Sequence, residues 1–183
     1  MAIVTRPERL DADRLIRPAR PGEEDLVLDL LSEASAWLRS RGIDQWPPRF
    51  PVASVRHQIS AGEALLVAGP DARPVATVAV AESDPDVWAG WDGSAFFVSR
   101  LAVTRRASGA DLGYTILDWV AGRAAARGRD YVRLATARDN SALRRYYELA
   151  GFTHVADPTH ANWPTSLYER PVDPSHQERI RVP

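Results

Sequence analysis

Apolar residues recur at helical spacing in several stretches of the chain. Over 21–42, Leu26, Leu30 and Ala34 stand four residues apart, acidic residues open the stretch and Gly42 closes it. This pattern is typical of a helix that buries one face. The same spacing predicts helices from Gly109 to Gly128, from Ser141 to Ala150 and, more briefly, over 52–61.

Shorter apolar runs between turn residues predict strands. The run AFFVSRLAV over 95–103 is too hydrophobic for the edge of a sheet, so we expect it in the interior. Further strands are predicted over 15–17, 64–68, 74–81, 131–136, 152–155 and 166–169. Helices and strands alternate, with one hairpin early and one late, which favours a mixed sheet with helices on its faces.

Two segments rich in proline, glycine or acidic residues interrupt this pattern. Three prolines exclude regular structure from IDQWPPRFP, over 43–51, and ESDPDVWAGWDGS, over 82–94, is predicted to be a polar loop. These segments carry Trp46, Trp88 and Trp91. Because tryptophan is costly to leave fully exposed, these rings either fill the core or line a pocket.

The chain has 183 residues, of which 45% are hydrophobic and 26% are charged. Such a composition favours one compact domain. We predict a flexible lead-in over 1–14, a single domain over 15–172 and a flexible tail over 173–183. Neither a signal peptide nor an apolar run of membrane-spanning length is visible. We therefore expect a cytoplasmic protein with no membrane partner.

Cysteine and lysine are both absent, and all 23 basic residues are arginine. Their absence excludes disulfides, thiolate metal sites, a cysteine nucleophile and a lysine Schiff base, and we predict no metal site. The net charge of −1 argues against a nucleic-acid partner. A nucleic-acid-binding regulator stays an alternative because of the cluster Arg105, Arg106, Arg123, Arg127 and Arg129.

One segment combines features that suit an anionic ligand. A buried strand leads through Arg105 and Arg106 to Gly109, and a helix containing Gly113 follows. The start of a helix presents unpaired N–H groups and a partial positive charge, and glycine lets a ligand approach the backbone. The segment could therefore hold a diphosphate, although a plain turn before a helix is the alternative.

The order of motifs over 96–155 resembles the GNAT superfamily of acyl-CoA-dependent N-acyltransferases. The matching residues are Leu101-Ala102-Val103, the loop Arg106-Ala107-Ser108-Gly109-Ala110-Asp111, Leu112-Gly113, Asn140, Tyr147 and Gly151-Phe152. The resemblance implies an α+β (mixed α/β) fold: a central, mostly antiparallel sheet of six to seven strands, with one splayed parallel pair and about four helices on its faces. It also implies acetyl-CoA as co-substrate.

The resemblance assigns cofactor-binding residues. They are Leu101, Ala102, Val103, Arg106, Ser108, Gly109, Ala110, Asp111, Leu112, Gly113, Asn140 and Tyr147. In the family the backbone of the Leu-Ala-Val-like triplet pairs with the pantetheine arm, and a backbone N–H near Val103 could hold the oxyanion. Asp111 stands where the family has Gly or Ala. It either faces outward beside the helix start or weakens CoA binding.

Tyr147 matches the tyrosine that the family uses to protonate the leaving thiolate, and it is the predicted catalytic residue. A phenol is protonated at neutral pH and can donate to a developing thiolate. The alternative is a tyrosine packed on the sheet. Asn140 similarly has two compatible roles, as a helix cap or as a partner of the pantetheine arm.

The acceptor amine must lose a proton, and no single residue marks this role in the family. Candidates are Glu82, Asp84, Asp86, His57 and His154, each of which could instead be a solvated surface group. The predicted substrate-binding residues are Trp46, Glu82 and Trp88, and the segment 158–168 with Trp163 could close the same wall. Neighbouring acidic residues, Asp44, Asp84, Asp86 and Asp92, would favour a cationic amine.

The sequence thus predicts an N-acetyltransferase that moves acetyl from acetyl-CoA to a primary amine of a small molecule. Attack would be direct, within a ternary complex. The alternative is a non-catalytic acyl-CoA-binding module of the same fold. An exposed edge strand is also compatible with a homodimer.

Overall fold

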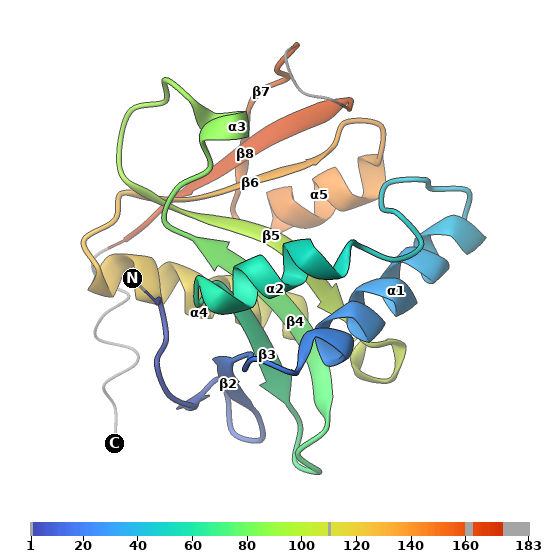
Figure 1. The fold of residues 1–183 in the computed structure, drawn as a ribbon. Coiled ribbons are helices and arrows are strands. Elements are labelled where there is room, and N and C mark those ends of the chain that lie inside the picture. The colour runs from blue at the N-terminus through green and yellow to red at the C-terminus, as the bar shows by residue number, and fades with distance from the viewer. Residues whose placement is uncertain (1, 110, 160–162, 174–183) are drawn as a thin grey trace. The chain divides into compact units, whose positions relative to one another are not determined.

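The computed structural model, drawn as a ribbon in Figure 1, describes residues 2–109, 111–159 and 163–173. The chain divides into two compact parts. The N-terminal part comprises Met1–Val80 and Arg100–Ile116, and the C-terminal part comprises Ala81–Ser99 and Leu117–Pro183. The strand β5 (Ala95–Val103) and the helix α4 (Leu112–Ala126) have several residues in each part. The boundaries predicted for the lead-in, domain and tail stay a prediction.

The elements lie close to the ranges that the hydrophobic pattern predicts. The N-terminal part contains β1 (Glu8–Arg9), β2 (Leu15–Pro18), α1 (Glu24–Ser40), α2 (Val52–Ser60), β3 (Ala64–Ala68), β4 (Pro74–Ala81, whose last residue is in the other part) and the 3₁₀ turn η1 (Arg105–Ala107). The C-terminal part contains α3 (Pro85–Trp88), β6 (Tyr131–Ala137), α5 (Ser141–Leu149), β7 (Thr153–Ala156) and β8 (Thr165–Pro171).

The strands follow the order β1-β2-β3-β4-β5-β6-β8-β7. Pairs β1–β2, β2–β3, β3–β4, β6–β8 and β7–β8 are antiparallel, whereas β5 and β6 are parallel. The predicted mixed sheet with one parallel pair is therefore confirmed.

The predicted numbers of strands and helices were too low. Among the described residues the sheet has eight strands, not six to seven, and five α-helices accompany it rather than about four. The extra strand β1 has two polar residues, too few to show a period, and pairs with β2. The extra helix α3 is one turn inside the segment predicted to be a loop, with Pro85 at its start.

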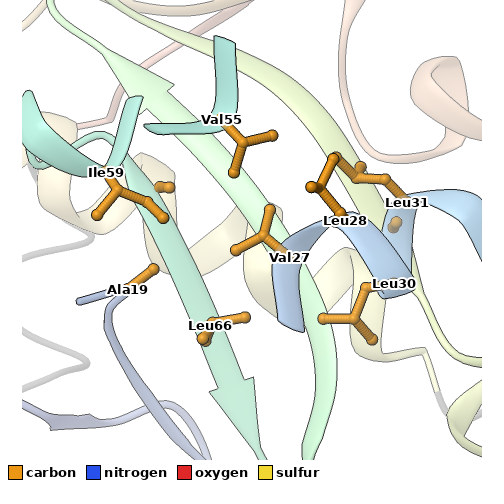
Figure 2. Packing of buried hydrophobic residues seen from close by; sticks show 10 residues of the cluster. Ala19, Val27, Leu28, Leu30, Leu31, Val55, Ile59 and Leu66 are labelled. Carbon is orange, nitrogen blue, oxygen red and sulfur yellow. The ribbon is translucent and has the colours of Figure 1, made fainter. Parts of the chain in front are cut away.

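The core of the N-terminal part lies between two helices and β3 (Figure 2). From α1 come Val27, Leu28, Leu30 and Leu31, from α2 come Val55 and Ile59, and from β3 come Ala64 and Leu66. The two β3 residues alternate, so both lie on the same face of the strand. Ala102 of β5 joins this cluster, so the packing of α1 and α2 also fixes the strand that carries the predicted cofactor contacts.

In the C-terminal part β8 lies between β6 and β7. Its Tyr168 is completely buried. The Tyr168 hydroxyl accepts a hydrogen bond from Arg144 Nε at 2.9 Å and donates one to Glu148 at 3.0 Å. Both partners are on α5. These bonds attach the helix that carries Tyr147 to the sheet strand β8.

Replacing a core leucine of α1 should cost far more stability than replacing an exposed one in the same helix. Leu31 is 0% exposed and Leu26 is 41% exposed. Leu31→Ala should lower the free energy of unfolding by about 2–5 kcal/mol because it leaves a cavity. Leu26→Ala should cost less than about 1 kcal/mol. Urea unfolding measures both, and equal losses would contradict the assigned core.

Candidate active site

The parallel pair of strands is short compared with the strands themselves. Its register joins Ala95–Val98 of β5 to Tyr131–Leu134 of β6. β5 continues through Ser99–Val103, and Ser99, the first residue after this ladder, is exposed. The pairing with β6 therefore ends before β5 does, and the predicted splay of the pair stays a prediction.

Arg100 gives β5 a local irregularity directly after that point. Its φ of 52° lies in the left-handed region, which is unusual for any residue except glycine and costs about 1 kcal/mol or more. Its guanidinium donates to Gln58 Oε1 at 2.7 Å and to Ser54 Oγ at 3.1 Å, and it stacks on the Phe50 ring at 4.6 Å. These contacts hold the strained residue against α2 and the preceding loop.

The three residues that follow carry the family-like triplet. Ala102 is buried in the core, whereas Leu101 and Val103 are half-buried. Thr104 then leaves the strand, and its backbone N–H donates to the Val75 carbonyl of β4 at 2.8 Å. The triplet is thus anchored through its central side chain while its neighbours stay partly accessible.

The loop from η1 to α4 exposes the residues predicted to hold a diphosphate. Arg106, Ser108 and Gly109 are exposed, whereas Leu112 and Gly113 are buried in the first turn of α4. Gly109 has φ 86° and nothing within 4 Å of the position where a side chain would begin. The backbone is therefore open to a ligand at this point. Ala110 lies outside the described residues.

Asp111 also adopts a left-handed conformation, with φ 50°. Its carbonyl accepts the backbone N–H of Thr115 at 3.0 Å, so it occupies the position directly before the helix. This conformation explains why glycine suits the position, and aspartate is one of the few other residues that tolerate it. The Asp111 side chain is exposed, which agrees with the outward-facing interpretation.

The arginines of the loop are tethered to the N-terminal part. Arg106 donates to the Pro74 carbonyl at 3.1 Å, and the backbone N–H of Arg105 donates to the Glu33 carboxylate at 2.7 Å. A groove of about 250 Å³ lies beside this loop. Its walls are Leu26, Asp29, Leu30 and Glu33 of α1 together with Pro74, Thr104 and Arg106.

Tyr147 lies on the buried side of α5. Its ring meets Tyr146 and Phe152 edge-on, with centroids at 5.5 Å and 5.9 Å. Burial raises the pKa of the phenol to about 12, and no hydrogen-bond partner for its hydroxyl occurs among the described residues. The hydroxyl is thus a protonated donor with no acceptor assigned to it.

Asn140 caps the same helix. Its side-chain oxygen accepts the backbone N–H of Leu143 at 3.0 Å, and the residue is buried. The structure confirms the cap that the sequence suggests. A role toward the pantetheine arm is not tested by this contact.

The predicted substrate-binding residues lie in both parts. Trp46 is half-buried, stacks edge-on against Phe50 at 5.5 Å and packs on the α1–α2 core. Trp88 is buried, contacts Trp91 and lies under the Arg133 guanidinium, which is 5.1 Å from its ring centre. Both rings therefore pack against side chains of the part of the chain that carries them, and a role in binding substrate stays a prediction.

The candidate bases differ in their surroundings. Glu82 pairs with Arg129 at 3.2 Å, and His154 pairs with Asp157 at 2.8 Å. His57 is exposed. Burial raises the pKa of Asp84, and the neighbouring charge of Asp86 adds to that shift. A hydrogen bond from the Val87 backbone opposes this shift, and a role for Asp84 as the base stays a prediction.

The comparison with known proteins assigns the family. The Acetyltransferase (GNAT) family model matches residues 30–152, which is more than half of the chain. The chain belongs to the GNAT acetyltransferase family. The match runs from residue 30, within α1, past the end of α5 and contains the β5–loop–α4 segment described above.

Similar proteins include one curated relative and several solved structures. The uncharacterized N-acetyltransferase YesJ of Bacillus subtilis (strain 168) is 29% identical over 144 residues, covering 74% of this chain and 79% of YesJ. A GNAT family acetyltransferase from Listeria monocytogenes 4b F2365 has a TM-score of 0.74 at 22% identity, covering 86% of this chain and 94% of that one. The structure of yncA from Salmonella typhimurium, solved with its cofactor acetyl-CoA, has a TM-score of 0.62 at 16% identity, covering 88% and 95%. The structural matches establish a shared fold.

Two features are absent from the described residues. No helix among them is both long enough and apolar enough to cross a membrane. No group of histidine and acidic side chains within residues 2–109, 111–159 and 163–173 has the geometry of a metal site.

Sequence reasoning missed Arg100 and Arg133. Arg133 is buried in β6, where it bonds Glu169 at 3.1 Å and lies over the rings of Trp88 and Tyr131. Both arginines stand in apolar strands, and that position alone could have drawn attention to them, because a buried charge needs a partner.

Removing the Asn140 cap should weaken α5 measurably. Asn140→Ala loses the bond to Leu143 and should lower the free energy of unfolding by about 1 kcal/mol. Asn140→Asp keeps an acceptor oxygen and should stay close to wild type. Thermal unfolding of the two variants compares them, and an unchanged Asn140→Ala would show that the cap contributes nothing.

Proposed function

We propose that this chain transfers the acetyl group of acetyl-CoA to a primary amine of a small molecule by direct attack in a ternary complex. The observation that carries the proposal is the end of the β5–β6 ladder at Val98 and Leu134, followed by the family-like triplet, loop and helix. A strand that leaves its parallel partner can accept an extended ligand along its backbone.

The loop supports the proposal as a holder for the diphosphate of CoA. Its exposed Arg106, Ser108 and Gly109 and the start of α4 offer a cation, a hydroxyl, an open backbone and the positive end of a 15-residue helix. Leu101 and Val103 would pair with the pantetheine arm. The donor chemistry at this position fits an anionic, extended thioester.

The proposed reaction forms one bond and breaks one. The amine nitrogen, after losing a proton, attacks the thioester carbonyl carbon, and the C–S bond then breaks to release the thiolate. The base takes one proton from the ammonium group before the attack. A second proton leaves the nitrogen as the tetrahedral intermediate collapses and ends on the sulfur, whose developing negative charge the Tyr147 hydroxyl stabilises by donating a hydrogen bond. Products are the amide and free CoA, and no covalent enzyme intermediate is required.

The Tyr147 hydroxyl is better suited to donate a hydrogen bond than to transfer its proton completely. Its pKa of about 12 keeps the phenol protonated over the working pH range. Complete proton transfer to a thiolate of pKa about 8.5 would be uphill. Its main contribution is therefore a hydrogen bond that stabilises negative charge on sulfur as the C–S bond lengthens.

Asp84 is the preferred base in this proposal. Its raised pKa makes the carboxylate a better proton acceptor than a fully solvated aspartate. Reaction through a water molecule would serve an acceptor that does not reach the carboxylate.

The alternative is a non-catalytic module that binds acyl-CoA, and Asp111 is the observation that favours it. A carboxylate near a diphosphate opposes binding by about 1 kcal/mol when both are solvated. The two functions differ in one measurement: both predict acetyl-CoA binding, and only the first predicts release of CoA in the presence of an amine.

Replacing Tyr147 by phenylalanine should reduce turnover without affecting folding. The phenol oxygen has no partner among the described residues, so Tyr147→Phe should change Tm little. It should lower kcat by roughly 10²-fold or more. Tyr146→Phe is the matched control and should retain turnover. An unchanged kcat in Tyr147→Phe would remove this tyrosine from the mechanism.

The pH profile gives an independent check of the same group. Because the pKa of Tyr147 is raised to about 12, its protonated form persists well above pH 10. The wild-type kcat should rise with pH as the amine and its base deprotonate and should show no decline before about pH 10. A decline at lower pH would mean that a different acid controls the step.

Removing the charge at Asp111 should strengthen acetyl-CoA binding modestly. Asp111→Asn keeps a residue that tolerates φ 50° and removes the carboxylate. The dissociation constant of acetyl-CoA should fall by up to about fivefold in low salt and return toward wild type in high salt. Thermal shift measures it: ligand at 100 times its Kd adds about 2.7 kcal/mol. No shift in either protein would contradict acyl-CoA binding altogether.

A further inference from the structure

Arg100 carries a charge that its protein neighbours do not neutralise. No acidic side chain pairs with it among the described residues, and its three contacts, Ser54, Gln58 and the Phe50 ring, are all neutral. The side chain is half-buried, and this burial lowers the pKa of the guanidinium without removing its charge at neutral pH. A cation withdrawn from water in this way is usually matched by an anion.

The position of Arg100 relates this charge to the reaction. It stands two residues after Val98, where pairing with β6 ends, and one residue before the triplet predicted to hold the pantetheine arm. A strand advances about 3.3 Å per residue, so the backbone of Arg100 lies within about 7 Å of that point. Its side chain extends from there toward Ser54 and Gln58 of α2. The Phe50 ring lies against the guanidinium, and Trp46 packs edge-on against Phe50, so the charge has aromatic surface beside it.

We propose that Arg100 binds a carboxylate of the acceptor, so that the acceptors are amines of amino-acid size that carry a free carboxylate. This inference rests on the proposed acetyl transfer. Of the five N–H groups of the guanidinium, Gln58 and Ser54 take one each, which leaves donors for two carboxylate oxygens. A single positive charge among neutral groups matches a monoanion better than a dianionic phosphate.

The inference changes the expectation drawn from the acidic loops. Asp44, one of the four aspartates expected to attract a cationic acceptor, pairs with Arg39 at 2.9 Å. Its charge is therefore already matched within the protein. In this proposal the acceptor is recognised by the single charge of Arg100, near the end of the β5–β6 pairing. The contact between Arg100 and the acceptor's carboxylate also positions the acceptor's amino group.

The test compares each acid with its own amide. The eighteen L-amino acids other than cysteine, whose thiol would react with the reagent, and proline, a secondary amine, are offered with acetyl-CoA beside their amides. Release of the CoA thiol is followed with a thiol reagent, to which a protein with no cysteine adds no background. At least one free acid should react about tenfold or more faster in kcat/KM than its amide. In Arg100→Gln the acid should lose roughly 30-fold, and the amide should change less than about threefold.

Two control variants separate recognition from a structural role. Gln58→Ala removes one tether and keeps the charge, and Arg56→Gln removes an exposed cation from the same helix. Recognition by Arg100 requires both to keep the preference for the acid. If Arg100 serves only to hold α2 in place, Arg100→Gln and Gln58→Ala should lower the rates of acid and amide equally, and the inference is wrong.

The remaining outcomes also overturn the inference. Faster reaction of amides than acids, or no reaction of any acid in the panel, rules out carboxylate recognition by Arg100. The proposed acetyl transfer would survive the first result. It would fail if acetyl-CoA caused no shift in Tm, or if a wider panel of small primary amines also gave no CoA release while acetyl-CoA still raised the Tm.

Discussion

The early end of one strand ladder is the constraint on which the site depends. A strand inside a sheet normally satisfies its backbone N–H and C=O groups on both sides. β5 pairs with β6 only through Val98, and the strand then continues through the triplet Leu101–Val103. Backbone groups on the side that β6 leaves need another partner. In the proposed function the pantetheine arm is that partner, and the thioester is thereby placed along β5.

The strained residue after the ladder serves both structure and recognition. Arg100 adopts a left-handed conformation in the middle of a strand, and contacts with Ser54, Gln58 and Phe50 hold it there. The core beneath α1 and α2 in turn holds these contacts, because Val55 and Ile59 are buried in it. In our proposal the same contacts orient a guanidinium for an acceptor carboxylate, so the strain at this position gains a functional reason.

Two departures from simple expectation have physical explanations. Asp111 replaces glycine at a position with φ 50°, and aspartate can adopt that conformation while its carboxylate stays exposed. Tyr147 is buried, which raises its pKa and makes it a persistent hydrogen-bond donor rather than a strong acid. The Asp111 carboxylate opposes binding of a diphosphate by only about 1 kcal/mol when both are solvated, and a buried phenol can still donate to the leaving sulfur, so both features are compatible with acyl transfer.

The sequence by itself determined the main elements and the family. Periodicity and turn residues predicted α1, the β3–β4 hairpin and β5, because burial of one face leaves a repeating apolar pattern. It also predicted a loop before α4 and Asn140 as the cap of α5, because glycine suits a turn and asparagine can accept a backbone N–H at the start of a helix. The two-residue strand β1 and the one-turn helix α3 were not predicted, because neither is long enough to show a repeating pattern of apolar residues.

Only the tertiary structure decided where the parallel pair ends and which groups meet the strained arginine. Those features depend on pairing between strands far apart in sequence and on packing of α2 against β5, and no local pattern encodes them. For the same reason the burial of Tyr147 and Trp88 could not be predicted from the sequence, because an aromatic residue can either fill a core or line a pocket and the residue type does not distinguish the two.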